Sequence, residues 1–281
     1  MAEPAVEVSW PELAAVVLSR ELRDGEVGSP GGARSEIPLA AARLAQLTHA
    51  PNLAVVTSAV GYVTNAIGKP WGPLCQSTTD YRNIHAGAEA VLPLLSVFRT
   101  RRDWFFAGGL QVDTFGNLNL TAVGDIKAPA LRGPGGAGLA YAGSCASRYF
   151  IYMQQHSRRS IVDKVDVVTS IGYGAGPDDR KRLGLRGGGP VLVITPMALF
   201  DFCETSCRLR LKSIHPPHTL EEVLDNTAAR IIVPEAVPLT TLPSERELSV
   251  LRQDVDRNGI LRRGVAGSGR KGEADAAAGR N

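Results

Sequence analysis

Short apolar runs that end in small or polar residues are the feature that most constrains the fold of this chain. Runs of this length and composition are typical of buried β-strands. The first run, Leu53 to Val56, leads into the small-residue turn Thr57-Ser58-Ala59-Val60-Gly61. Further strands are expected in DWFFAGGLQVDTFGNLNLTAVGD (103–125), RYFIYMQ (148–154), KVDVVTS (164–170), PVLVITPMALFDF (190–202) and RLRLKSI (208–214).

Helical patterns alternate with these strands in the first part of the chain. Ser9 is expected to cap a first helix, with Glu12 at the capping-box position and Gly25 at the end. A second helix follows a glycine-rich turn at 28–36, for which a plain tight turn is favoured over a phosphate cradle. Three shorter helices are expected around 88–98, from Thr219 onward, and at 244–256 with Ser244 as the cap.

The order of these elements predicts an α/β fold. Alternating helices and strands followed by a strand-rich half favour an open, mostly parallel sheet flanked by helices, with added antiparallel strands. A chain of 281 residues is long enough for one large α/β domain or two small ones. The order of the elements favours one, to which we assign residues 1–263. The tail, residues 264–281, has too few apolar residues to fold and is expected to be disordered.

Composition excludes several classes of protein. The net charge is only +3 and the basic residues are scattered, so no nucleic-acid footprint is present. No apolar run approaches the roughly 20 residues of a membrane span, and the N-terminus lacks a signal core. Both observations favour a soluble, cytoplasmic protein that binds neither nucleic acid nor membrane. The four cysteines lack the spacing of a zinc site or disulfide framework, and we expect incidental thiols and no metal: Cys75, Cys145, Cys203 and Cys207.

The segment GGLQVDTFGNLN (108–119) is the most informative stretch of the sequence. Two glycines permit close approach of another chain or a ligand. Four short polar side chains then surround one turn: Gln111, Asp113, Asn117 and Asn119. The alternative is a hairpin in which Gly116 and Asn117 supply the turn geometry and Asp113 caps it.

A second glycine cluster is LRGPGGAGLAYAGS (131–144). Gly133, Gly135 and Gly136 can present backbone N–H groups to an oxyanion or a thioester carbonyl, or they can belong to a flexible surface loop. A third cluster, TSIGYGAGPDDRKR (169–182), also follows a predicted strand. Together these turns favour backbone-lined binding of a large polar ligand.

The histidines carry a weaker signal. HPPH (215–218) is interpreted as the start of the helix beginning near Thr219, because a third metal ligand is not nearby in sequence. His156 lies beside Arg158 and Arg159, which fits either a phosphate contact or, as we prefer, a solvated basic turn.

These segments together resemble the beta subunit of class I coenzyme A transferases, the glutaconate and 3-oxoacid group. The resemblance extends from about residue 10 to residue 260. It implies the open α/β fold of that class (NagB/RpiA-like), a separate alpha subunit in an α2β2 assembly, and an active site where the two chains meet. The matching pieces are GGLQVDTFGNLN, RGPGGAG, VDKVDVVTSIGYGAGP, VLVITPMALFDF, RLRLKSIHPPHTLEEV and LPSERELSVLRQDVD.

One departure from the family bears on the reaction. Transferases of this family use a beta-chain glutamate as nucleophile, and its position falls at Ser58, give or take one residue. No carboxyl group lies between Leu53 and Asp80, so carboxylate catalysis has no nucleophile there. The resemblance then favours a branch of heteromeric hydrolases of steroid and cholesterol breakdown, which lack this glutamate. They open a ring of a cyclic diketone attached to CoA with a base from the alpha chain.

The hydrolase branch is also favoured by LRGPGG, after which Gly138 and Leu139 stand where the usual transferase loop has Asn-Asp. We expect no permanently bound cofactor, with coenzyme A present only as part of the substrate. A CoA transferase subunit and a non-catalytic partner remain as alternatives. The residues expected to bind the substrate or its thioester are Thr57, Ser58, Gln111, Asn117, Gly133, Gly135 and Gly136.

Overall fold

The computed structural model describes residues 7–31, 36–57, 62–64, 103–136 and 138–263. The chain divides into two compact units: unit 1 comprises Met1–Gly25, Gly32–Ala88 and Leu242–Asn281, and unit 2 comprises Glu26–Gly31 and Glu89–Thr241. Ser58, the helix predicted around 88–98 and the tail at 264–281 lie outside the described residues. The assignment of residues 1–263 to one domain stays a prediction.

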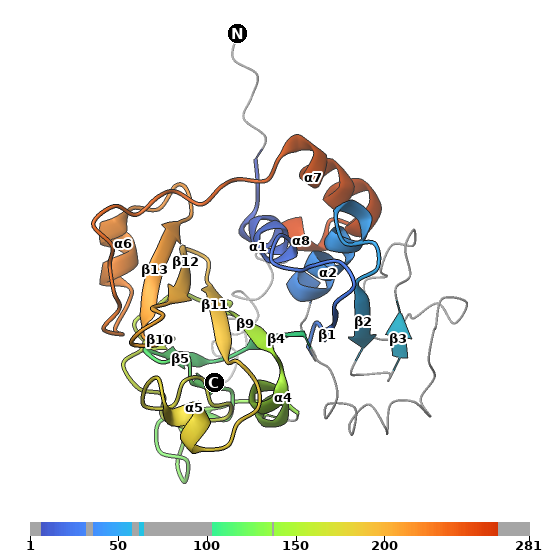
Figure 1. Cartoon of the computed structure of the whole chain (residues 1–281). Helices are drawn as coiled ribbons and strands as arrows, with labels where there is room; N and C mark the ends of the chain where they lie inside the picture. Colours follow the sequence, from blue (N-terminus) through green and yellow to red (C-terminus); the bar gives the residue numbers. More distant parts are fainter. Residues whose placement is uncertain (1–6, 32–35, 58–61, 65–102, 137, 264–281) are drawn as a thin grey trace, which may run out of the picture. The chain divides into compact units, whose positions relative to one another are not determined.

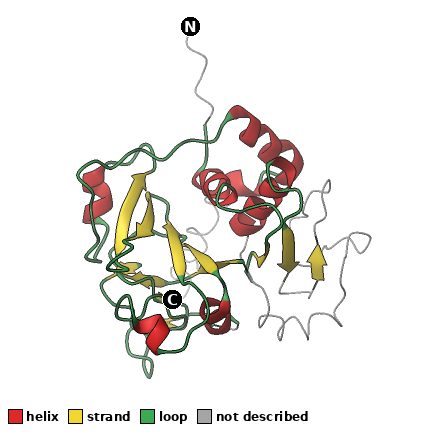
Figure 2. Ribbon diagram, in the orientation of Figure 1, coloured by secondary structure: helices red, strands yellow, loops and turns green. Residues whose placement is uncertain are grey.

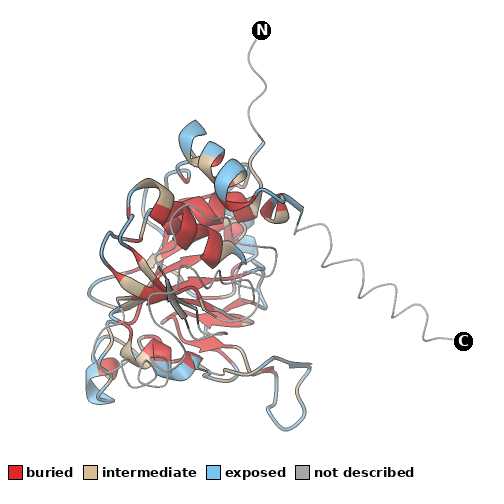
Figure 3. Cartoon of the chain, turned by 90° about the vertical axis from the view of Figure 1, so that its right-hand side faces the viewer, coloured by how far each residue is buried: buried red, intermediate tan, exposed pale blue. Residues whose placement is uncertain are grey.

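Unit 1 is built mainly of helices (Figures 1 and 2). Its apolar core joins residues from both ends of the sequence, including Val16, Leu44 and Leu251. Buried faces of its helices are seen in Figure 3. The elements are α1 (Trp10–Ser19), α2 (Glu36–Thr48), β2 (Ala54–Thr57), β3 (Tyr62–Thr64), α7 (Glu245–Val250), the π-helix η2 (Leu251–Val255) and α8 (Ile260–Arg263).

In the first helix the predicted capping box is confirmed, but the predicted C-terminal end is wrong. The Glu12 N–H donates to Ser9 Oγ (3.4 Å), and the Ser9 N–H donates to a Glu12 carboxylate oxygen (3.0 Å). The helix stops at Ser19 rather than near Gly25. The reason is local: the N–H groups of Glu21 and Leu22 bond the carbonyls of Leu18 and Ser19, a tighter pattern that ends an α-helix.

Ion pairs hold the helices of unit 1 together. Arg252 donates two hydrogen bonds to the buried Glu12 carboxylate, at 2.7 and 3.0 Å. Arg20 makes a similar two-point contact with Glu247, at 2.8 and 2.7 Å. The hydrogen bonds from Arg20 lower the pKa of Glu247 to about 2. The early and late helices are therefore joined by charged contacts as well as by apolar packing.

Unit 2 contains the predicted parallel core with antiparallel additions. Its main sheet has the order β13-β12-β11-β9-β4-β1. The first four strands along the chain, β1 (Val27–Ser29), β4 (Trp104–Gly108), β9 (Arg148–Tyr152) and β11 (Pro190–Ile194), pair in parallel. Two antiparallel strands, β12 (Ala198–Phe202) and β13 (Leu209–Ile214), follow β11. The α/β class with a mostly parallel sheet is confirmed.

Smaller elements complete unit 2 (Figure 1). In the described part of the chain, these are three helices and two short sheets, and no helix there is long and apolar enough to cross a membrane. The helix predicted from Thr219 is confirmed, with Thr219 as its cap. These elements are β5 (Gln111–Asp113), β6 (Leu118–Asn119), β7 (Ala122–Val123), β8 (Leu131–Arg132), α4 (Leu139–Cys145), β10 (Ile161–Val162), α5 (Asp179–Arg182) and α6 (Leu220–Asp225).

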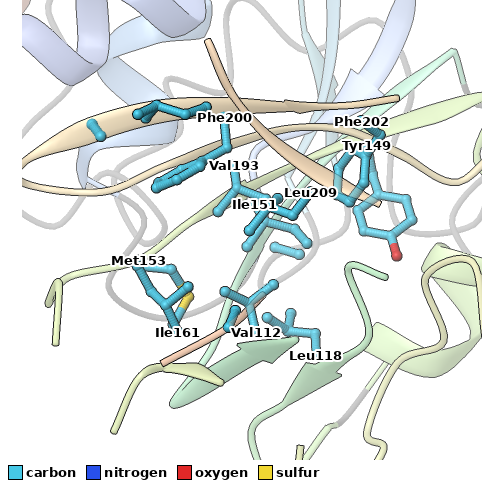
Figure 4. Packing of buried hydrophobic residues seen from close by; sticks show 14 of the residues in the cluster. Val112, Leu118, Tyr149, Ile151, Met153, Ile161, Val193, Phe200, Phe202 and Leu209 are labelled. Atoms are coloured by element: carbon cyan, nitrogen blue, oxygen red, sulfur yellow. The ribbon is translucent and has the colours of Figure 1, made fainter. Parts of the chain in front are cut away.

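The core of unit 2 lies between the main sheet and the short sheet formed by β10, β5 and β6. Val112 and Leu118 come from the short sheet and point toward Ile151 and Val193 of the main sheet (Figure 4). All four of these side chains are fully buried. This packing fixes the segment 108–119 against the strands, which positions the turn discussed below.

Two strand predictions are wrong. Residues 190–202 form two strands, because Thr195 Oγ1 accepts from the N–H groups of Met197 and Ala198 (3.3 and 3.0 Å) and reverses the chain. Residues 164–170 form no strand except one bridge, from Ser170 to Leu118. There the side chain of Gln111 takes an N–H that a strand would give to a neighbouring strand.

Candidate functional site

The turn at 113–117 is built around a buried carboxylate. Asp113 is only 3% exposed, and its side chain accepts hydrogen bonds from the N–H groups of Phe115 and Asn117, each at 3.0 Å. Burial raises the pKa of Asp113, while the hydrogen bonds oppose that shift. Gly116 has φ +70°, and a Cβ there would lie 2.7 Å from the Phe202 ring. The hairpin alternative, with Asp113 as the cap, therefore describes this turn.

Asn117 ties this turn to the third glycine cluster. Its side-chain oxygen accepts from the N–H groups of Gly172 (2.9 Å) and Gly174 (3.1 Å). Its amide nitrogen donates to Asp113 (3.0 Å) and to the Gly174 carbonyl (2.8 Å). The amide group thus makes four contacts within the protein. Asn117 was predicted as a substrate-binding residue, and its contacts here are those of a scaffold.

The backbones of the two turns touch directly. A Cβ on Gly172 would lie 2.3 Å from the carbonyl carbon of Gly116, closer than real side-chain contacts occur. The Tyr173 N–H also donates to the Phe115 carbonyl (2.8 Å). Glycine at position 172 is therefore required by a close approach of two chain segments.

Gln111 links the same region to residues 164–170. Its amide nitrogen donates to Asp166 (3.0 Å), and its oxygen accepts from the Asn119 side chain (2.7 Å) and the Asp166 N–H (3.1 Å). Gln111 is buried, so these bonds replace contacts with water. Gln111, like Asn117, is held by the protein itself.

In the glycine loop at 133–136, fewer backbone N–H groups are available to a ligand than predicted. The Gly133 N–H donates to the Thr121 carbonyl (2.8 Å) and the Gly135 N–H to the Leu120 carbonyl (3.1 Å). Among the described residues, the Gly136 N–H makes no hydrogen bond. The expectation that all three glycines offer donors is corrected, because two of them close the loop onto the 120–121 segment.

The surroundings of the three glycines also differ. A Cβ on Gly133 would lie 2.2 Å from the Leu120 carbonyl oxygen, and one on Gly136 would lie 2.6 Å from the Thr169 methyl group. Gly135 has φ +85° and open space where a Cβ would be. The loop is therefore anchored at Gly133 and open at Gly135, directly before α4.

Arg180 was not predicted as a site residue from the sequence. Its guanidinium is buried and donates to the carbonyls of Gly143 (3.0 Å), Gly172 (2.8 Å) and Gly187 (2.9 and 3.0 Å). Burial lowers the pKa of Arg180. These bonds connect the end of α4 to the third glycine cluster. The signal in the sequence was an arginine between two glycine-rich stretches, but it stands in DDRKR, which has the composition of a solvated charged run.

The structure also shows the surroundings of His156 and His215. The prediction of a solvated basic turn is confirmed for Arg158 and Arg159, which are exposed, and is wrong for His156. The ring nitrogens of His156 lie 2.8 Å from Thr195 Oγ1 and 3.1 Å from Thr227 Oγ1. Burial lowers the pKa of His156 to about 4, and that of His215 to about 4 as well. Within the described ranges, no three His, Cys, Asp or Glu residues are grouped so that they could hold a metal ion.

The structure thus brings part of the predicted site together. Gln111, Asn117 and the three glycines lie within unit 2, joined through the segment 119–121. Thr57 belongs to unit 1, where its backbone pairs with Tyr62 at the end of β2. Ser58 follows it and lies outside the described residues. In the second unit the site is a set of interlocked glycine turns, in which the Gly136 N–H makes no hydrogen bond to the described residues.

Comparison with known proteins places this arrangement in a family. The family profile described as Coenzyme A transferase matches residues 12–226. The chain belongs to the coenzyme A transferase family. A CoA-transferase member of known structure, glutaconate coenzyme A-transferase from Acidaminococcus fermentans, superposes with a TM-score of 0.78 at 27% identity, over 92% of this chain and 98% of that chain.

Two relatives of this CoA-transferase family chain carry different activities. The B-type subunit of the 3-oxoadipate CoA-transferase of Pseudomonas knackmussii is 36% identical over 87% of this chain and 92% of its own length. The cholesterol ring-cleaving hydrolase IpdB subunit of Mycobacterium tuberculosis is 29% identical over 90% of this chain and 97% of its own length. The resemblance to the beta-type transferase chains and to the hydrolase branch is confirmed. The family accordingly includes both reactions considered from the sequence.

Proposed function

We propose that this chain is the beta subunit of a heteromeric enzyme that hydrolyses a carbon–carbon bond in the ring of a cyclic diketone CoA thioester. The observation that carries the proposal is the absence of any Asp or Glu from Leu53 to Thr79 in the sequence. This stretch contains the β2 strand and the residues after it, where the transferases of the family place their glutamate. Without a carboxylate, the acyl anhydride needed for CoA exchange has no group on which to form.

Hydrolysis needs less from this chain than transfer does. Water adds to a ring ketone, the adjacent carbon–carbon bond breaks, and the departing carbon takes up a proton, leaving a carboxylate. The base that activates the water would come from an alpha-type partner. This chain would contribute a donor for the oxygen on which negative charge develops, and the Gly136 N–H is the candidate.

The requirement for a partner is supported by the relatives. Both are described as subunits, one of a 3-oxoadipate CoA-transferase and the other of a cholesterol ring-cleaving hydrolase. We propose an alpha-type chain of the same family as the partner, an α2β2 assembly, and a ring compound from steroid or cholesterol breakdown as the substrate class. The protein would act in the cytoplasm with no resident cofactor, and coenzyme A would enter only with the substrate.

A transferase remains the second candidate, favoured by the 36% identity to a 3-oxoadipate CoA-transferase chain. The test uses this chain co-expressed with its alpha-type partner. The complex is incubated with the CoA thioester of a cyclic 1,3-diketone, and separately with an acyl-CoA plus a free carboxylic acid. We expect a product heavier by one water in the first reaction and no new acyl-CoA in the second.

A Ser58→Ala variant sharpens this test. We expect turnover to fall by no more than about tenfold, because a neutral hydrogen bond contributes about 1 kcal/mol. A CoA adduct on any residue between Thr57 and Asp80, trapped by borohydride, would contradict the hydrolase and support the transferase. If neither reaction occurs in the complex while the alpha chain is stabilised, the non-catalytic partner is the correct description.

A further inference from the structure

The loop that joins β12 to β13 contains two cysteines, Cys203 and Cys207, in the sequence CETSC. Phe202 and Leu209 pair on either side of it. The Cys203 N–H donates to the Arg208 carbonyl (2.9 Å), and the Cys207 N–H donates to the Cys203 carbonyl (2.8 Å). Both residues are partly exposed and both thiols are free. The hairpin therefore holds two reduced thiols on one closed turn.

The backbone of this turn brings the two cysteines within reach of each other. A hydrogen bond spanning four residues keeps their Cα atoms about 6 Å apart, inside the range of about 4.4–6.8 Å that a disulfide bridges. Cys207 has φ +55°, in the left-handed region that glycine favours. A glycine would suit this position better, so the presence of a thiol there is not explained by turn geometry.

The two thiols have opposite electrostatic surroundings. Polar groups of Ser206 and Thr205 beside the sulfur lower the pKa of Cys203 to about 6, and of their hydroxyls that of Thr205 is within hydrogen-bond distance, at 3.4 Å. The pKa of Arg210 is raised mainly by its hydrogen bonds to Asp201, and the nearby Cys203 thiolate adds to this shift. Burial, followed by the charge of Cys203, raises the pKa of Cys207. At neutral pH, Cys203 is thus the nucleophile and Cys207 the protonated neighbour.

We propose that Cys203 is a peroxide-reactive thiolate and that Cys207 resolves its oxidised form into a disulfide. The Cys203 thiolate attacks one oxygen of hydrogen peroxide and the O–O bond breaks. The leaving hydroxide takes a proton to become water, and Cys203 becomes a sulfenic acid. Cys207, on losing its proton, attacks that sulfur and displaces the second oxygen as water. Two thiols and one peroxide give one disulfide and two waters.

The first test measures the thiolate. The rate of alkylation of Cys203 by iodoacetamide is followed from pH 4.5 to 9.5 by mass spectrometry of the peptide 187–208, which trypsin releases between Arg186 and Arg208. We expect a midpoint near pH 6 in the folded protein and near pH 8.5 in the same protein unfolded in urea. The same midpoint in both states would overturn the assignment of Cys203 as the nucleophile.

The second test follows the oxidation. Treatment with a small excess of hydrogen peroxide should remove two hydrogens from the peptide 187–208 and block its alkylation, while Cys145 stays alkylatable. Cys207→Gly suits the left-handed backbone and should keep the fold. In this variant dimedone should label Cys203 as a sulfenic acid.

Three results would overturn the proposal: two alkylated cysteines after peroxide, oxidation at Cys145 before Cys203, or a disulfide between two chains. Cys203→Ser provides the matched control, since Cys207 alone should then remain unoxidised under the same conditions. None of these measurements needs the alpha-type partner or an acyl-CoA substrate. Their outcome is therefore separate from that of the proposed function.

Discussion

The helices of unit 1 and the candidate-site turns of unit 2 secure their polar groups by different means. Unit 1 uses opposite charges: Arg252 holds Glu12, and Arg20 holds Glu247. In unit 2 the turns of the candidate site depend on uncharged partners. The Asp113 carboxylate is bonded by backbone and amide N–H groups, and the Arg180 guanidinium by carbonyls. Charged pairs respond to salt and to strong acid, whereas amide networks respond to the loss of a single partner. The two units should therefore fail under different conditions.

The largest effect is expected from Asn117→Ala. The change removes four hydrogen bonds and leaves the N–H groups of Gly172 and Gly174 and the Gly174 carbonyl without the Asn117 partner. Asp113 loses one donor and keeps the backbone N–H groups of Phe115 and residue 117. We expect a loss of about 3–5 kcal/mol in the free energy of unfolding, measured by urea denaturation. Asn226→Ala is the matched control, since Asn226 is exposed and its side chain makes one bond. Similar losses in the two variants would contradict the scaffold role.

Acid should weaken unit 2 before unit 1. In the folded protein the pKa values of His156 and His215 are about 4, below the usual 6.5. Their contribution to the free energy of unfolding is therefore complete above pH 6.5 and is lost as the pH falls toward 4. The lost stability approaches about 3 kcal/mol for each histidine over that whole interval. The charged groups near them are His218 and its partner Glu222.

Unit 1 should respond at lower pH. Glu247 has its pKa lowered from 4.5 to about 2, so its contribution is present above pH 4.5 and is lost as the pH falls through 2. Hydrogen exchange measured in each unit between pH 7 and pH 3 shows at which pH each unit loses stability. His156→Gln should flatten the dependence between pH 6.5 and 4 in unit 2. Earlier opening of unit 1 on acidification would refute the order.

Within unit 2, the glycine loop offers a smaller and more local comparison. Gly135→Val should cost about 1–2 kcal/mol, because φ is +85° although the space around it is open. It should also reduce turnover of the assembled complex by hindering approach to the loop. Gly138→Ala is the control, since a Cβ there meets nothing within 4 Å and its φ is −82°. Unchanged turnover in a folded Gly135→Val protein would show that the loop is a surface feature only.

The smallest effect concerns salt. The pair of Arg20 and Glu247 is partly exposed, with 32% and 20% of the side chains accessible, so its contribution is screened to about 0.5–1 kcal/mol. Glu247→Gln should lower stability by that amount in dilute buffer and by less in 1 M sodium chloride. Asn117→Ala should show the same loss at both salt concentrations. If Glu247→Gln lowered stability equally at both salt concentrations, the claim that unit 1 depends on charged pairs would be wrong.

The sequence correctly predicted the structural features that are determined by residues close together along the chain. The capping box at Ser9, the helix cap at Ser244 and the strands at 148–154 and 208–214 are all confirmed, because cap and strand are determined within a few residues. The resemblance to a family also predicted the fold class. The predicted roles of Thr57 and Ser58 in binding substrate stay predictions.

The errors concern residues whose partners are distant in sequence. The segment 164–170 has the composition of a strand, yet its partner Gln111 lies 55 residues away and takes the bonds that a strand would use. His156 and Arg180 resemble solvated charges because nothing nearby in the sequence shows that Thr227, Gly143 and Gly187 enclose them. Gly133 and Gly135 were expected to offer donors that the 120–121 carbonyls already accept.

The contact between Gly172 and Gly116 sets a limit on how this protein can vary. Because one backbone lies against the other, no larger residue at 172 can be accommodated by trimming a neighbouring side chain. In a library that randomises single positions, Gly172 should accept no replacement, and no second substitution at 116 should restore one. Gly135, with nothing beside it, should accept asparagine or aspartate, the residues that most readily adopt a left-handed backbone. Tolerance to substitution thus separates glycines that hold two segments together from glycines that only shape a turn.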